Sequence, residues 1–165
     1  GVYEFFEAAK IILSSNKDIK FTIVGPYDPN LKSCIKKSLF EEIKNSKQIE
    51  YKGKVKDVRP FLKVSSIFVL PSYYREGVPK SSLEAMAMGR PIITCDSIGC
   101  KETVKNNKNG FLIPPKDINS LVLKMKLFID NPELIRRMSS ESIIFAKEFD
   151  VREVNAKIIK SMKIR

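Results

Sequence analysis

Apolar residues along the chain alternate between helical spacing and short continuous runs. Residues 2–14 carry an apolar stripe at helical spacing, and the runs at 20–25, 66–72 and 90–96 are strand-sized. Two shorter segments, 49–53 and 111–115, predict two more strands. The intervening segments predict helices or helical turns, listed in chain order as 28–45, 56–65, 78–89, 97–110, 117–131 (capped by Asp117), 132–149 and 151–164.

This order of elements predicts an α/β fold. The strand runs are apolar throughout rather than alternating, which is typical of a parallel sheet covered by helices on both faces. We therefore expect a Rossmann-like sheet. Open sheets of this kind bind ligands at the carboxyl ends of their strands. The loops of interest follow the predicted strands and comprise residues 25–30, 53–57, 71–79 and 95–101.

Composition narrows the function classes. The 165 residues suit one domain spanning 1–165, and no apolar run approaches the ~18 residues that cross a bilayer. The net charge of +11 favours anionic partners, but scattered lysines suit a generally basic surface equally well. No nucleic-acid motif accompanies them. Three cysteines without any histidine argue against a metal site and a Ser-His or Cys-His catalytic unit, and indicate reduced thiols in a cytosolic protein.

The segment 73–89 carries the candidate chemistry. Pro79 opens a predicted helix, and Val78 before it is a poor side-chain cap, so the amides of Lys80 and Ser81 remain available. The helix dipole, the Lys80 charge and the hydroxyls of Ser81 and Ser82 would add to a phosphate site there. The alternative is that water or Glu76 caps the helix.

Two glutamates flank this helix start. Glu76 lies in the preceding loop, and Glu84 lies at the edge of an expected buried stripe formed by Leu83, Met86 and Ala87. A carboxylate accepts two hydrogen bonds, which suits a vicinal diol. A nucleotide sugar places a diol on each side of a diphosphate. The alternative, an acid/base dyad for glycoside hydrolysis, is disfavoured because these carboxylates would flank an anionic phosphate.

The stretch "EGVPKSSLEAMAMGRPII" resembles the signature of family 4 glycosyltransferases, which have the two-domain GT-B fold. That pattern is E-G-x-P followed by E-A-x-A-x-G-x-P. It is met by Glu76, Gly77, Pro79, Glu84, Ala85, Ala87, Gly89 and Pro91. The strand "FTIVG", the segment "IEYKGKVKDVRPFLKVSSIFVLPS" and the segment "GCKETVKNNKNGFLIPPKDINSL" also resemble family landmarks, in the family's order.

The resemblance implies roles for the loop residues. Glu84 would bind the ribose hydroxyls of the donor, and Glu76 would be the catalytic-site carboxylate at the donor hexose. Backbone groups of Gly77 and Val78 would contact the hexose.

The resemblance also implies the contacts to the rest of the nucleotide. Amides near Ser82 and Leu83 would hold the diphosphate, while Lys54 and Val55 would border the base. Gly25 would let the chain approach the nucleotide, or would simply form a tight turn. The family retains anomeric configuration and needs no metal, so the nucleoside diphosphate sugar would be a substrate and no cofactor is expected.

The resemblance further implies a piece of a longer enzyme. The family places an Arg and a Lys, a first strand and an acceptor-binding domain before the position of Gly1. The terminal helix, 150–165, would cross back to that domain. Without the first strand, the sheet would close up, pair with another chain, or have a gap. We expect apolar surface beside strands 21–24 and 67–70, self-association, and an inactive isolated chain.

The predicted function is that of a retaining hexosyltransferase. It would act on a saccharide or lipid-linked saccharide acceptor in surface polysaccharide or glycoconjugate biosynthesis. We expect a cytoplasmic location, with peripheral membrane contact left open. The alternatives are a GT-B sugar epimerase or phosphorylase and a non-catalytic α/β nucleotide-binding domain; a receiver domain lacks its acidic cluster here. Salt-sensitive binding would indicate a nucleic-acid module instead.

Overall fold

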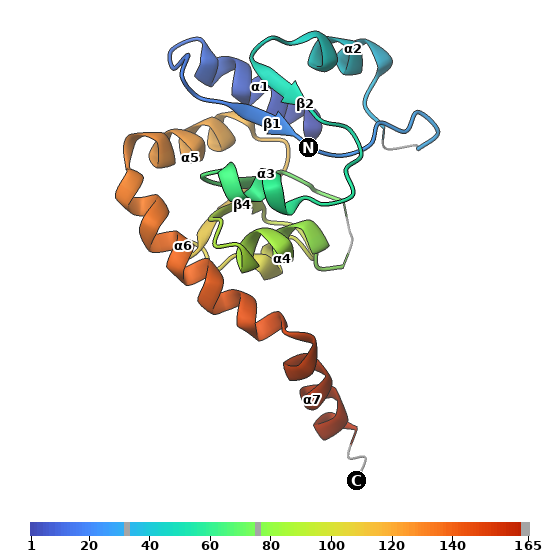
Figure 1. Cartoon of the computed structure of the whole chain (residues 1–165), viewed down its shortest axis with the longest axis vertical. Helices are drawn as coiled ribbons and strands as arrows, with labels where there is room; N and C mark the ends of the chain where they lie inside the picture. Colours follow the sequence, from blue (N-terminus) through green and yellow to red (C-terminus); the bar gives the residue numbers. More distant parts are fainter. Residues whose placement is uncertain (32–33, 75–76, 163–165) are drawn as a thin grey trace.

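The computed structural model describes residues 1–31, 34–74 and 77–162. Strands and helices alternate through the first two thirds of the chain, and helices close it (Figure 1). The elements in order are α1 (Val2–Leu13), β1 (Phe21–Ile23), α2 (Lys37–Asn45), β2 (Ile49–Tyr51), α3 (Arg59–Val64), β3 (Phe68–Leu70), α4 (Lys80–Ala87), β4 (Ile92–Cys95), the 3₁₀ helix η1 (Lys101–Thr103), β5 (Gly110–Ile113), α5 (Ile118–Asp130), α6 (Pro132–Ala146), the 3₁₀ helix η2 (Lys147–Phe149) and α7 (Val151–Ser161).

The strands form two parallel sheets. In the first, β1 pairs with β2, with Phe21 opposite Ile49. In the second, the order is β3-β4-β5, with Phe68 opposite Ile92 and Ile92 opposite Gly110. Every pairing joins parallel strands, as the continuous apolar runs predicted. The five predicted strands and the α/β class are confirmed.

Strands β1 and β3 do not pair with each other. Within the described residues, each has a partner on one edge only: β2 beside β1, and β4 beside β3. The sheet has therefore not closed up, and a gap is the arrangement seen in this single chain. All three residues of β3 are half-buried, whereas all four of β4 are buried, as expected of an edge strand beside a central one.

Helices cover both faces of the three-stranded sheet. Side chains of successive strand residues point to opposite faces. Ile93 joins a core cluster that includes Phe6 and Ile12 of α1, while its neighbour Ile92 packs with Met86 of α4. The first cluster also contains Phe21 and Ile49 of the two-stranded sheet. Both sheets therefore pack against α1 and α5 in one shared core.

A buried polar turn fastens β5 beside β4. Asn109 is 1% exposed; its side-chain carbonyl accepts from the Lys105 amide at 2.7 Å, and its Nδ2 donates to the Thr103 carbonyl at 3.0 Å. Its own backbone carbonyl accepts from the Ile92 amide at 3.0 Å. A Cβ on the following Gly110 would lie 1.9 Å from the Ile92 carbonyl oxygen, so only glycine permits this approach.

Two helix predictions need comment. The helix expected over 28–45 was wrong in its first part, apart from 32–33, which lie outside the described residues: α2 begins at Lys37, and Asp28 instead closes a turn by accepting from the Asn30 amide at 3.0 Å. The cap predicted at Asp117 is confirmed. Its carboxylate accepts from the Ser120 amide at 2.9 Å, and these hydrogen bonds lower the pKa of Asp117.

Helix α6 packs against α4, and α7 continues outward from the body, so the end of α7 lies far from the amino end (Figure 1). Apolar side chains of α7 stay in solvent, among them Val151, Val154 and Ile158. Across the described residues, no helix has both the length and the apolar character needed to traverse a bilayer.

Candidate functional site

The turns after β1 and β2 are tied together. The Gly25 amide donates to the Gly53 carbonyl at 2.9 Å, and the Tyr51 hydroxyl donates to the Gly25 carbonyl at 2.8 Å. Gly25 has a φ of +152°, which favours glycine, and no atom lies within 4 Å of the position its Cβ would take. The predicted residues Gly25, Lys54 and Val55 therefore lie on two connected turns with open space beside the Gly25 backbone.

An aromatic cluster supports these turns. The rings of Tyr27 and Phe40 stack with centroids 3.8 Å apart, and Phe40 meets Tyr51 edge-on at 5.3 Å. On the β2 side, the Arg59 guanidinium and amide bind Asp57 at 2.9 Å, which lowers the pKa of that carboxyl. Lys54 is exposed and Val55 is half-buried, so both residues are at least partly accessible to solvent.

Two amides at the start of α4 have no acceptor among the described residues. The helix begins at Lys80, with Pro79 as the N-cap residue and no side-chain cap. The amides of Ser82 and Leu83 donate to the Pro79 carbonyl at 3.1 and 3.2 Å. For the amides of Lys80 and Ser81, no acceptor is found in the part of the chain that the structure describes. The amides selected by the helix-start argument are thus the open ones.

The hydroxyl of Ser82 is a further polar group in the first turn of α4. Its side chain is fully buried, and its hydroxyl has no hydrogen-bond partner among residues 1–31, 34–74 and 77–162. A buried hydroxyl without a partner costs about 1–3 kcal/mol, so such groups are uncommon in native proteins. Its position in the first turn of α4 places this unused donor and acceptor next to the open amides.

The buried stripe of α4 differs from the one expected. Ser82, Ala85 and Met86 are buried, Leu83 is half-buried, and Ala87 is exposed, so Ala87 was wrongly placed in the stripe. Small side chains at 82 and 85 let the helix lie close to the sheet, where Met86 packs on Ile92. Glu84 is half-buried at the edge of this stripe, as predicted.

The loop between β3 and α4 is anchored from β4. Thr94 donates its hydroxyl to the Leu70 carbonyl at 2.6 Å, and Ser97 donates to the Ser72 carbonyl at 2.9 Å. Gly77 and Val78 are both exposed just before α4. Glu76, the predicted catalytic residue, lies outside the described residues.

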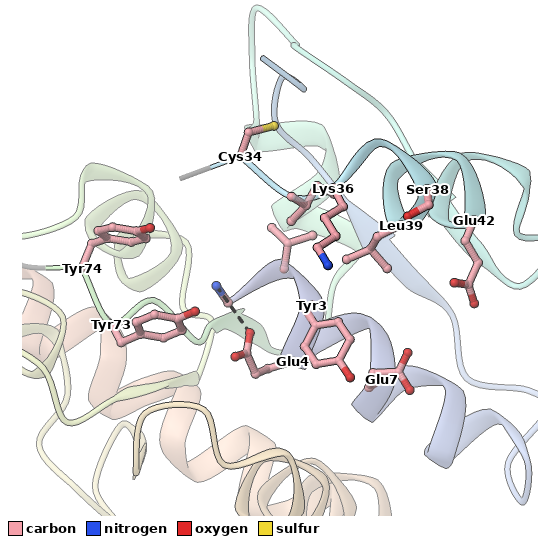
Figure 2. Close-up of a pocket in the computed structure, with 13 residues that line it drawn as sticks. Tyr3, Glu4, Glu7, Cys34, Lys36, Ser38, Leu39, Glu42, Tyr73 and Tyr74 are labelled. Atoms are coloured by element: carbon pink, nitrogen blue, oxygen red, sulfur yellow. Dashed lines mark ion pairs between the residues drawn. The ribbon is translucent and has the colours of Figure 1, made fainter. Parts of the chain in front are cut away.

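A pocket of about 520 Å³, which the sequence reasoning missed, adjoins this loop (Figure 2). It is lined by the first turns of α1, by residues before and within α2, and by Tyr73 and Tyr74 after β3. None of the predicted site residues lines this pocket. The only available signal was two adjacent tyrosines directly after a predicted strand.

Comparison with solved structures supports the fold. The structure of HepE from Anabaena in complex with UDP superposes with a TM-score of 0.85 at 20% identity, covering 99% of this chain and 45% of that one. The C-terminal domain of a glycosyl transferase group 1 family protein (LpcC) from Francisella tularensis superposes with a TM-score of 0.79 at 25% identity. That match covers 92% of this chain and 80% of the other.

Sequence relatives agree with the structural ones. An N,N'-diacetylbacillosaminyl-diphospho-undecaprenol alpha-1,3-N-acetylgalactosaminyltransferase from Campylobacter jejuni is 33% identical over 97% of this chain. A UDP-Gal:alpha-D-GlcNAc-diphosphoundecaprenol alpha-1,3-galactosyltransferase from Escherichia coli is 38% identical over 72% of it. The chain spans 40% of the first relative's length and 30% of the second's. The family model "Glycosyl transferases group 1" matches residues 1–144, so the chain belongs to the group 1 glycosyltransferases.

Proposed function

We propose that this chain is the carboxyl-terminal, donor-binding domain of a retaining glycosyltransferase. The enzyme would transfer a hexosyl residue from a nucleoside diphosphate sugar to a saccharide or lipid-linked saccharide in surface polysaccharide or glycoconjugate biosynthesis. Two comparisons support the proposal. The Campylobacter and Escherichia relatives are transferases whose names contain a saccharide linked to diphospho-undecaprenol, which supports the acceptor class. The Francisella structure is itself a C-terminal domain, which supports the domain assignment. Nucleotide sugars are made in the cytoplasm, which is where we place the activity.

The observation that carries the proposal is the start of α4. Two amides without acceptors among the described residues lie there, at the positive end of the helix dipole, and the buried Ser82 hydroxyl, which has no partner among those residues, belongs to the same turn. The exposed Lys80 adds a cation. These groups would bind the diphosphate and stabilise the charge that develops on it when it leaves. No metal is required for that step in the proposed mechanism.

The neighbouring residues would recognise the rest of the donor. Glu84, half-buried beside the helix start, would accept hydrogen bonds from the two ribose hydroxyls. The open backbone at Gly25, with Lys54 and Val55 on the adjoining turn, would border the base. Gly77 and Val78 would contact the hexose through their backbone groups, and Glu76 would lie near its anomeric carbon.

In the proposed reaction, the bond between the anomeric carbon and the diphosphate oxygen breaks. An acceptor hydroxyl oxygen forms the new bond on the same face of the sugar, and its proton goes to the departing diphosphate. The residues before Gly1 and the acceptor-binding domain are expected to complete this site, so the isolated chain should bind nucleotide weakly and transfer no sugar.

Calorimetric titration of the longer protein that contains this chain with UDP, GDP, ADP and their sugars tests the donor site. Glu84→Ala removes two charge-assisted hydrogen bonds, each of about 1.5–3 kcal/mol, so the affinity should fall at least about a hundredfold. Glu141→Ala is the matched control, because Glu141 is also a half-buried glutamate but lies on α6. Ser82→Ala should weaken binding of the diphosphate-containing ligands. The proposal fails if no nucleotide binds, or if the Glu84 and Glu141 variants bind alike.

A further inference from the structure

A lysine in the turn after β5 has an unusual backbone conformation. Lys116 has a φ of 62°, and the Asp117 amide donates to the Pro114 carbonyl at 3.4 Å across the turn. With proline at its second position and a positive φ at its third, the turn resembles type II, whose third position normally holds glycine or asparagine. A lysine there is strained, so its side chain is placed at a cost in stability.

The strained turn directs the Lys116 side chain onto an aromatic ring. Its amine lies 5.3 Å from the centroid of the Tyr73 ring, which is within the range of a cation–π contact. No carboxylate of the described residues forms an ion pair with this amine. The backbone of Lys116 also hydrogen-bonds the Cys95 thiol. The turn is thus held at the end of β4 while its side chain reaches Tyr73.

This contact crosses the end of the central strand. Lys116 follows β5 and Tyr73 follows β3, and β4 lies between these two strands. Because adjacent strands are roughly 4.8 Å apart, β3 and β5 are separated by about 10 Å, a distance that needs a long side chain. The contact therefore involves the paired side of β3, not the edge that has no partner strand among the described residues.

The described residues just before α4 have little packing of their own. Gly77 and Val78 are exposed, and a Cβ on Gly77 would meet no atom within 4 Å. Their position therefore depends on contacts that hold the neighbouring parts of the loop. One such contact is the hydrogen bond that Ser97 donates to the Ser72 carbonyl at 2.9 Å. The cation–π contact at the next residue is a second.

We propose that Lys116 is a positioning residue for the donor sugar. Its amine holds Tyr73, and Tyr73 in turn sets the course of the segment that leads to Gly77 and Val78. The proposal rests on the function proposed above, in which the backbone of those two residues contacts the donor hexose. A contact can shift a conformational equilibrium only by its own free energy. Loss of a partly exposed cation–π contact should therefore weaken hexose recognition by a factor of about two to five.

Paired titrations of the longer protein that contains this chain separate the hexose from the nucleotide. The probes are UDP, GDP and ADP, each alone and joined to glucose, galactose or an N-acetylhexosamine; the nucleotide whose sugar binds the unchanged protein is used throughout. Lys116→Met keeps the length of the side chain and removes its charge. It should weaken binding of the nucleotide sugar about two- to fivefold and leave binding of the free nucleotide unchanged. Lys116→Arg keeps a cation over the ring and should restore the affinity for the nucleotide sugar.

Relief of strain distinguishes positioning from folding. Lys116→Gly removes the side chain from a left-handed position, so thermal unfolding should not shift to lower temperature, whereas binding of the nucleotide sugar should weaken as in Lys116→Met. Asn107→Gly is the matched control, because Asn107 has a similar φ of 64° in the turn before β5 and lies outside the proposed site. Its binding should be unchanged. Lys116→Met added to Tyr73→Leu should weaken binding no further than Tyr73→Leu alone, since both remove one contact.

Several results would overturn the proposal. An equal loss for the free nucleotide would mean that the amine acts on the nucleotide rather than on the loop. A loss beyond about tenfold would exceed what the ring contact can supply and would indicate direct contact with the donor. An additive loss in the double variant would show that Lys116 does not act through Tyr73. If no nucleotide sugar binds the unchanged protein, the proposed function fails and this role falls with it, whereas unchanged binding in Lys116→Met refutes this role alone.

Discussion

The buried turn at Asn109 allows a pH-dependent test of the fold. Its side chain accepts from the Lys105 amide at 2.7 Å and donates to the Thr103 carbonyl at 3.0 Å, at 1% exposure. Asn109→Ala removes both hydrogen bonds and leaves both backbone groups without this partner. Asn109→Asp has nearly the same shape, keeps the acceptor for the Lys105 amide, and replaces the donor facing Thr103 by a carboxylate oxygen.

The expected magnitude follows from two lost contacts. Each orphaned, buried group costs about 1–3 kcal/mol, so Asn109→Ala should destabilise by roughly 2–6 kcal/mol. For a domain of this size, 1 kcal/mol shifts Tm by about 2–4 °C, which gives a decrease of about 4–24 °C. The ionised Asp variant should lose more than the Ala variant at pH 7, because a buried charge also opposes a carbonyl.

The sign of the pH effect is fixed by desolvation. Burial should raise the folded-state pKa of the new carboxyl above its unfolded value of about 3.9. The charge penalty is therefore absent below about pH 4, grows as the pH rises toward the folded pKa, and is constant above it. At pH 4 the protonated carboxyl can donate to the Thr103 carbonyl, so the Asp variant should then be more stable than the Ala variant.

Thermal unfolding by circular dichroism at pH 4 and pH 7 measures both variants. Asn107→Asp is the matched control, because Asn107 is exposed in the same turn and its φ of 64° is tolerated by Asp. Its Tm should stay near that of the unchanged chain at each pH. If Asn109→Asp loses the same stability, relative to the unchanged chain, at both pH values, the reasoning from burial and hydrogen bonding is refuted.

Three further predictions concern the core, the thiols and the sheet gap. Met86→Ala, in a fully buried position against Ile92, should cost about 2–5 kcal/mol in urea unfolding; a loss under 1 kcal/mol would contradict the packing. Burial raises the pKa of Cys95 to about 11, so at pH 8 a thiol reagent should label half-buried Cys34 well before Cys95, and equal rates would disprove the burial. The edges of β1 and β3 that have no partner strand among the described residues should make the chain self-associate, which a strictly monomeric sedimentation profile at high concentration would exclude.

Local signals explain how much of the fold the sequence could predict. Short strand-sized segments located all five strands, and Asp117 marked the start of α5 correctly, because both signals act within a few residues. The extent of α2 was overestimated, since the Asp28 turn competes with helix through a side-chain hydrogen bond that the apolar spacing does not reveal.

The candidate site was predictable where it is contiguous in sequence. The helix start at Lys80 and Ser81 and the edge position of Glu84 followed from capping and periodicity. The burial of Ser82 did not, because a serine in a buried stripe depends on how closely the helix approaches the sheet. The tyrosine pocket joins α1, α2 and the β3 loop, so it depends on tertiary packing that no local pattern encodes.

The turn at Asn109 also governs the chemical ageing of the chain. Asn109 precedes Gly110, and in a mobile Asn-Gly pair the glycine amide nitrogen attacks the side-chain carbonyl carbon, releasing ammonia through a succinimide. Here the hydrogen bonds from Lys105 and to Thr103 hold that side chain, and strand pairing with Ile92 holds the Gly110 backbone. Deamidation must therefore wait for the turn to open. Each such event leaves an acidic residue that weakens the turn, so damage to one molecule makes its refolding less complete.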